Sequence, residues 1–141
     1  MQQAHLANYN SELVNWKVDD SIYRSFVLSP EIDPVFDGDM NWRRLLWEYF
    51  YPRIRKETSL TGAAEIVLHH LREQVKIAQV EDTPKTIVEM WRQEQADGRG
   101  WEAICVAALR SAGIPARLSV LGPAEFWNGD EWKVASKDPV P

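Results

Sequence analysis

Residues 98–117, GRGWEAICVAALRSAGIPAR, decide how this chain folds. The first part of the stretch has the apolar spacing of a helix, and Gly113 lies where a C-cap glycine ends one, directly before Ile114-Pro115. The apolar positions of this helix are Trp101, Ile104, Cys105, Ala108, Leu109 and Ala112. We therefore predict a core helix that ends at Gly113 and leads into a β-strand.

After this helix the apolar period shortens to that of strands. Three short segments, RLSVL, AEFW and EWKVAS, cover Arg117–Leu121, Ala124–Trp127 and Glu131–Ser136. Asn128-Gly129-Asp130 separates the last two segments and is typical of a hairpin turn. The C-terminal part is thus expected to form a small antiparallel sheet.

Before residue 98 the periodicity is helical. Leu28–Met40, which holds two prolines and an Asp-Gly, is the exception, and we expect an ordered loop there, packed by Ile32, Val35 and Phe36. Helical periodicity covers Ser11–Val27, with a break near Asp19-Asp20, and Leu60–Ile77. It also covers Asn41–Tyr51, which we expect Pro52 to end. A last helix is expected to begin at Thr83-Pro84, with Thr83 as its N-cap. An N-terminal helical lobe (1–97) followed by a core helix and sheet (98–141) predicts one α+β domain.

Composition bounds the class of protein. With 141 residues, 45% of them hydrophobic and 26% charged, the chain suits one globular domain. A net charge of −5 argues against nucleic acid as a partner, and no apolar run approaches the roughly 18 residues that a membrane span needs. The compartment stays open, because an exported protein whose signal peptide was removed would have the same composition.

The opening stretch resembles the core of the transglutaminase-like superfamily, which shares its catalytic arrangement with papain-like cysteine proteases. Leu109–Arg117 (LRSAGIPAR) is similar to the phrase that ends the family's core helix, and Glu125-Phe126-Trp127, the turn and Trp132 are similar to the strands that follow. Phe26–Pro30 and Asn41–Arg44 look like the lead-in of bacterial members. The resemblance implies a truncated transglutaminase-like core, and the end in KDPVP indicates a piece of a longer protein with further domains.

The family's catalytic residues are expected to be missing. In such a site a thiolate is stabilised at a helix N-terminus, a His takes its proton and a carboxylate orients the His. By the resemblance, the nucleophile position is Gly98, fifteen residues before Gly113, and the His position is Leu121, four residues before Glu125. Asp138 matches the third, acidic position with a slightly different spacing. The implied domain is a degenerate, non-catalytic member.

Cys105 is the single cysteine, so the chain forms no internal disulfide. It lies on the apolar stripe of the core helix, where a thiol is desolvated and inert. The alternative is an active cysteine acyltransferase or peptidase of the same superfamily, in which Cys105 works with a distant His.

Other polar clusters are expected to be ordinary helix surface. His69-His70 and Glu73 could form part of a metal site, but adjacent side chains on a helix point about 100° apart and no second ligand cluster exists. We expect no metal and no cofactor. A basic group around the third predicted helix, Asn41–Tyr51, is likewise expected to be a charged face; it comprises Arg43, Arg44, Arg53, Arg55 and Lys56.

Trp127 and Trp132 flank the hairpin turn, with Glu125 nearby. Sugar or peptide ligands stack on such rings beside a carboxylate, although cross-strand aromatic pairs also simply fix a hairpin register. Trp101, close to the Gly98 position, has the same two explanations. The sequence therefore favours a non-catalytic scaffold or a glycan- or peptide-binding module in a larger bacterial protein. A purely structural domain beside a catalytic module is a further hypothesis.

Overall fold

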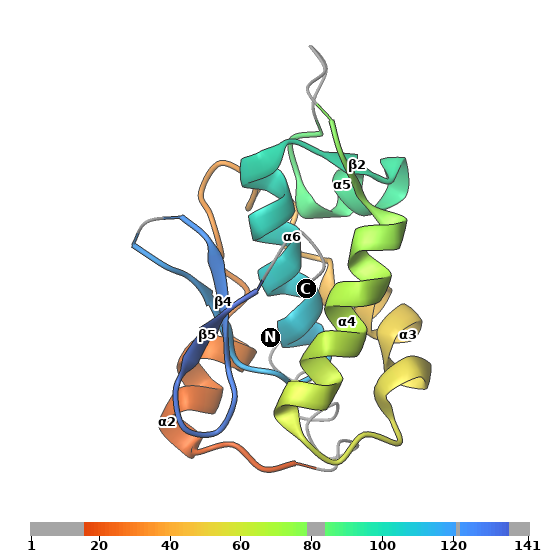
Figure 1. The fold of residues 1–141 in the computed structure, drawn as a ribbon. Helices are drawn as coiled ribbons and strands as arrows, with labels where there is room; N and C mark the ends of the chain where they lie inside the picture. Colours follow the sequence, from red (N-terminus) through yellow and green to blue (C-terminus); the bar gives the residue numbers. More distant parts are fainter. Residues whose placement is uncertain (1–15, 79–83, 121, 136–141) are drawn as a thin grey trace.

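The computed structural model describes residues 16–78, 84–120 and 122–135. Helices come first and a three-stranded antiparallel sheet comes last, which confirms the predicted α+β class (Figure 1). None of the helices in these ranges is long and apolar enough to span a membrane. The elements are α2 (Asp20–Tyr23), the π-helical turn η1 (Arg24–Leu28), α3 (Arg43–Ile54), α4 (Leu60–Gln74), β1 (Lys76–Ile77), α5 (Ile87–Gln93), β2 (Gln95–Ala96), α6 (Gly98–Ser111), β3 (Ala116–Leu118), β4 (Ala124–Trp127) and β5 (Trp132–Val134).

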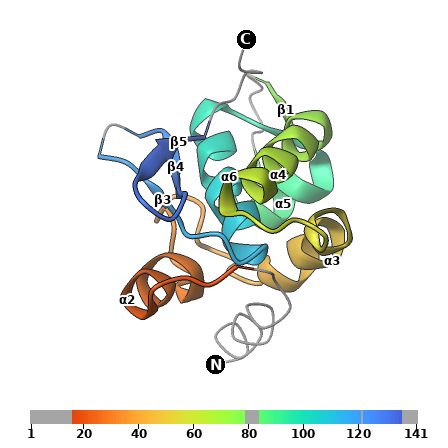
Figure 2. The same cartoon turned by 60° about the horizontal axis from the view of Figure 1, so that its bottom comes forward.

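Helix α6 is enclosed on every side. All residues from Gly100 to Ala116 are buried. Helices α3, α4 and α5 pack on one flank of α6, and the sheet packs on another (Figure 2). The small and apolar residues of this stretch suit such a central position, and the buried charged residues Glu102 and Arg110 lie in the same enclosed part of the helix.

Both ends of α6 carry the caps that the sequence encodes. The Asp97 side chain accepts a hydrogen bond from the Gly100 N–H at 2.6 Å. At the other end Gly113 has a φ of 82°, and the Ile114 N–H donates to the Leu109 carbonyl at 2.9 Å. This is a Schellman ending, which confirms the predicted C-cap.

The antiparallel sheet has the order β3-β4-β5, and Trp127 pairs with Trp132 across the hairpin. Ala124 and Phe126 of β4 are buried, while Glu125 and Trp127, which alternate with them, are half-buried on the other face. The predicted hairpin is thus confirmed, and its alternation puts a carboxylate and two indoles on the opposite face from Ala124 and Phe126, where Trp127 still packs in part against the core.

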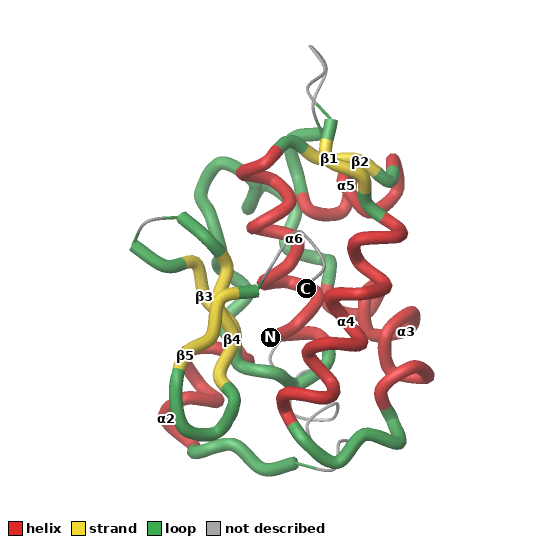
Figure 3. The backbone as a smooth tube through the Cα atoms, viewed as in Figure 1, coloured by secondary structure: helices red, strands yellow, loops and turns green. Residues whose placement is uncertain are grey.

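A second, parallel pair of strands was not expected. Strands β1 and β2 pair over two residues each, at the end of the molecule where α6 begins (Figure 3). They explain why α4 ends at Gln74 and not at Ile77: Val75 is already extended, and the Lys76 N–H donates to the Glu94 carbonyl at 3.0 Å. Strand pairing therefore overrides the helical periodicity of this segment.

Two further predicted helix boundaries need correction. Helix α3 runs through Pro52 to Ile54, because only one N–H is missing and the Arg55 N–H again reaches the Tyr51 carbonyl at 3.0 Å. Helix α5 begins at Ile87 with Thr86 as N-cap, whose hydroxyl accepts from the Glu89 N–H at 3.1 Å. The Glu89 carboxylate accepts in turn from the Thr86 hydroxyl at 3.3 Å and from the Lys85 N–H at 3.4 Å. This cap replaces the expected start at Thr83-Pro84; Thr83 itself lies outside the described residues.

The first predicted helix is described only from Trp16 onward. Its expected break is confirmed, because Asp19 is the N-cap of α2 and accepts from the Ser21 N–H at 3.0 Å. The residues between Trp16 and Asp19 are not helical, and the helical turns continue one residue past Val27 to Leu28 as η1.

Candidate functional site

The N-terminus of α6 lies where the resemblance requires a nucleophile. Gly98 is the first residue of this helix, directly after the capping residue Asp97. Free N–H groups and the helix dipole would stabilise a thiolate at such a position. Gly98 has no side chain, so this end of α6 offers the electrostatic setting of the site without its reacting atom.

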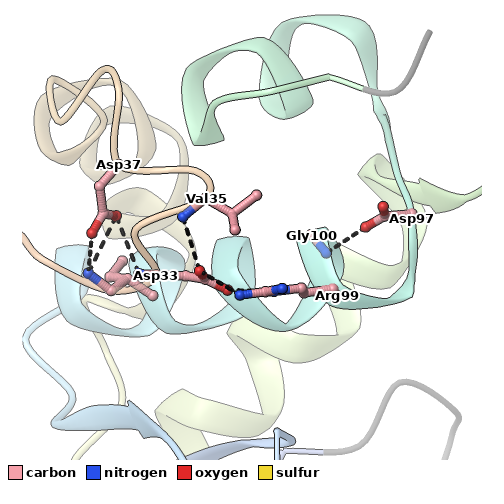
Figure 4. Close-up of polar contacts among 7 residues, drawn as sticks. Asp33, Val35, Asp37, Asp97, Arg99 and Gly100 are labelled. Atoms are coloured by element: carbon pink, nitrogen blue, oxygen red, sulfur yellow. Dashed lines mark hydrogen bonds and ion pairs between the residues drawn. The ribbon is translucent and has the colours of Figure 1, made fainter.

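The Leu28–Met40 segment is bound to the same end of α6 by an ion pair (Figure 4). The buried Asp33 carboxylate accepts from Arg99 Nε at 2.8 Å and Arg99 Nη2 at 2.9 Å, and also from the Val35 N–H at 3.0 Å. The hydrogen bond from Arg99 lowers the pKa of Asp33 below its ordinary value. Asp37 accepts from the Ile32 N–H at 3.0 Å, so two carboxylates organise the segment. It is the ordered loop that we expected.

The packing of this loop differs in one residue from the prediction. Phe36 is buried and Ile32 packs against the core, as expected. Val35, however, is 55% exposed, because its backbone is held in the turn by Asp33 while its side chain points outward. The apolar spacing alone carries no sign of that turn.

Cys105 is 0% exposed, which confirms that it belongs to the core. Burial is the main cause that raises its pKa well above the ordinary value. His69 lies elsewhere, on α4, with its side chain largely exposed and its Nε2 3.4 Å from Glu73 Oε1. Among the described residues, no group of three His, Cys, Asp or Glu side chains could hold a metal ion.

Trp101 is not available to a ligand. It is 1% exposed and lies in the part of α6 that is buried on all sides. Of the two explanations offered for Trp101, this burial supports core packing and not a role as a binding residue beside Gly98.

Glu125, Trp127 and Trp132 come together on the outer face of the sheet. The two indole rings meet edge to face with centroids 5.5 Å apart. Arg117 joins them: its Nε lies 3.0 Å from Glu125 Oε1, and its guanidinium lies 4.0 Å from the centroid of Trp132. Phe26 of η1 packs edge-on against Trp132 at 4.8 Å. These five residues form what we call the sheet-face cluster.

Sequence reasoning missed Arg117 and Phe26 in this cluster. Arg117 pairs with Glu125 in the β3–β4 register, which depends on the geometry of the loop between them. Phe26 reaches the cluster from a helix about ninety residues upstream. The one signal in the sequence was the opposite charge of Arg117 and Glu125, because opposite charges favour facing positions on neighbouring strands once the register is known.

Two buried arginines were also missed. Arg43, expected on a charged face, and Arg110 are at most 5% exposed. Arg110 donates to the carbonyls of Ala116, Ser29 and Glu31 at 2.8 to 3.0 Å, and Arg43 donates to those of Val27, Leu28 and Arg110. Burial lowers the pKa of each to about 10, so both remain charged at neutral pH. They bind η1, the following loop and β3 to the C-terminal end of α6.

Leu121 and Asp138, the other two positions that the resemblance implied for the site, lie outside the described residues. Comparison with known proteins adds no relative: no family model, no curated protein and no solved structure matches this chain. The site must therefore be interpreted from its own residues.

Proposed function

We propose that this chain is a non-catalytic, transglutaminase-like domain that binds a glycan or a peptide within a larger bacterial protein. The observation that carries the proposal is Gly98 at the first position of α6. A helix N-terminus can activate a thiol only if a thiol is there, and Cys105, further along the same helix, is wholly buried. This burial supports a binding or scaffold role over the alternative of a cysteine acyltransferase or peptidase.

The sheet-face cluster is the proposed ligand site. Glu125, Trp127 and Trp132 are each half-buried, so each keeps some surface in solvent. A carboxylate beside indole edges offers hydrogen bonds and apolar contact together, which is what binding sites for sugars and extended peptides require. The contacts of Arg117 and Phe26 hold these side chains in place and also attach η1 to the sheet. The cluster therefore stabilises the domain whether or not it binds a ligand.

A binding screen tests this function. We expect at least one member of a glycan array or peptide library to shift the indole NMR signals of Trp127 and Trp132. Glu125→Gln should then weaken that ligand by roughly tenfold or more, because a hydrogen bond to a charged group contributes about 1.5–3 kcal/mol. Trp127→Phe, which keeps an aromatic ring in the sheet, should weaken it as well.

Glu48→Gln is the matched control, since Glu48 is an exposed carboxylate that pairs with Arg44 at 3.0 Å on α3. This variant should bind as the wild type does. Flat responses across both libraries would reject the binding role and leave the scaffold role alone.

A further inference from the structure

The antiparallel sheet is closed at one edge. Ser119 donates its N–H to Pro123 across the β3–β4 pair, and in an antiparallel pair the bonding groups of alternate residues face the partner strand. Ala116 therefore faces the outer edge of β3, where its carbonyl accepts from Arg110 Nε at 3.0 Å. Helix η1 also packs beside β3. The Arg110 side chain therefore bonds the outer edge of β3, where a further strand would otherwise pair.

The other edge, formed by β5, pairs with no further strand among the described residues. Ala135 donates its N–H to the Ala124 carbonyl at 2.8 Å, so Lys133, two residues earlier, also faces β4. Trp132 and Val134 must then direct their N–H and C=O groups away from the sheet. In the described parts of the chain, no hydrogen bond reaches these groups, and Val134 is 62% exposed. Such an edge is a template for another strand.

The side chains along β5 indicate which kind of strand can pair with this edge. Glu131 and Lys133 lie on either side of Trp132, with Lys133 Nζ 2.9 Å from Glu131 Oε1, and both side chains are mostly exposed. A lone lysine on an edge strand repels other strands. In β5 an acidic, an aromatic and a basic residue follow one another. When a second copy of the strand runs antiparallel about a two-fold axis through Trp132, Glu131 of each copy lies opposite Lys133 of the other.

We propose that β5 pairs antiparallel with β5 of a second copy of this chain, about a two-fold axis at Trp132. In this register the outward N–H and C=O groups of the two Trp132 residues bond each other, and two opposite-charge pairs flank them. A register centred on Lys133 is less stable, because it sets the two Lys133 ammonium groups opposite each other. The interface is isologous, as a closed dimer requires.

The pairing joins the two sheet-face clusters. The strands form one six-stranded sheet, and Trp132 of each copy lies beside Trp132 of the other on the face that also carries Trp127. The second copy thereby contributes a ring to the surface assigned to the ligand, although the dimer itself does not depend on that function. A contact over three residues of one strand is small, so the association is weak and depends on concentration.

Charge reversal at Glu131 and Lys133 tests the pairing. In sedimentation equilibrium into the millimolar range, the wild-type chain should associate to a dimer. Glu131→Lys and Lys133→Glu each set like charges opposite each other, and each should weaken association by roughly tenfold. An equimolar mixture of the two variants should recover the wild-type affinity, because lysines of one variant then face glutamates of the other.

Circular dichroism of each variant shows whether it keeps its fold, which is expected because both side chains lie in solvent. A wild-type chain that stays monomeric into the millimolar range would overturn the proposal. A dimer affinity that neither single charge reversal changes would also overturn it, and so would a mixture of the two variants that associates no more tightly than each variant alone. A monomer that still binds a glycan or peptide would leave the proposed function intact, which separates the two claims.

Discussion

Replacing Arg110 by Met is expected to lower the free energy of unfolding by about 3–5 kcal/mol, because three carbonyls each lose a hydrogen bond to a charged group that contributes roughly 1.5–3 kcal/mol, offset in part by water. The Arg110 guanidinium satisfies three backbone carbonyls, those of Ala116, Ser29 and Glu31. Methionine fills much of the same volume but donates nothing, so these carbonyls lose their partners; the hydrogen bond to Ala116 is buried, and those to Ser29 and Glu31 are partly buried. Urea denaturation followed by circular dichroism measures the loss.

Two further variants make the result specific to the hydrogen bonds of Arg110. Arg44→Met, on the exposed pair with Glu48, should change stability by no more than about 0.5 kcal/mol. Arg110→Lys should fall between the two, because an ammonium keeps the charge but cannot reach carbonyls in three directions. If Arg110→Met is as stable as Arg44→Met, then the guanidinium does not hold the loop and β3 to α6.

Trp101→Ala is expected to lower the free energy of unfolding by about 3–5 kcal/mol, the range for large aromatic side chains removed from a core. The reason is its 1% exposure in the first turn of α6, where the helix is already enclosed by the core. Trp127→Ala, on the half-buried sheet face, should lose only about 1–2 kcal/mol. Chemical denaturation of both variants measures the difference.

The comparison of the two tryptophans decides which of them belongs to a ligand surface. Should Trp101→Ala fail to fold, Trp101→Phe provides the measurable step, with a smaller loss of about 1–2 kcal/mol. A Trp101 variant that loses less stability than Trp127→Ala would return Trp101 to the candidate binding residues.

The parts of the fold that follow from local chemistry could be predicted from the sequence. The Gly113 ending of α6 and the turn of the β4–β5 hairpin each depend on a few neighbouring residues with strong conformational preferences. The pairing of Trp127 with Trp132 follows from that hairpin. The burial of Cys105 follows from its place on an apolar stripe.

The parts that depend on distant segments could not be predicted. Strand β1 exists only because residues near Glu94 supply its partner. Arg43 looks like surface until η1 and α6 bring carbonyls to it, and Trp101 is enclosed only because elements from both halves of the chain surround α6. The sheet-face cluster combines both cases. Its two indoles lie close together in the sequence, whereas Phe26 comes from a distant segment.

The absence of an activated thiol is tested most directly by labelling the native protein with a maleimide probe at neutral pH. Ser25→Cys places a reference thiol at an exposed position of η1. Cys105 of the wild type should react at least about a thousandfold more slowly than this reference, because it is reached only through rare opening of the fold, and it should react fully in denaturant. Labelling of native Cys105 as fast as the reference thiol would contradict a non-catalytic domain built on a buried cysteine.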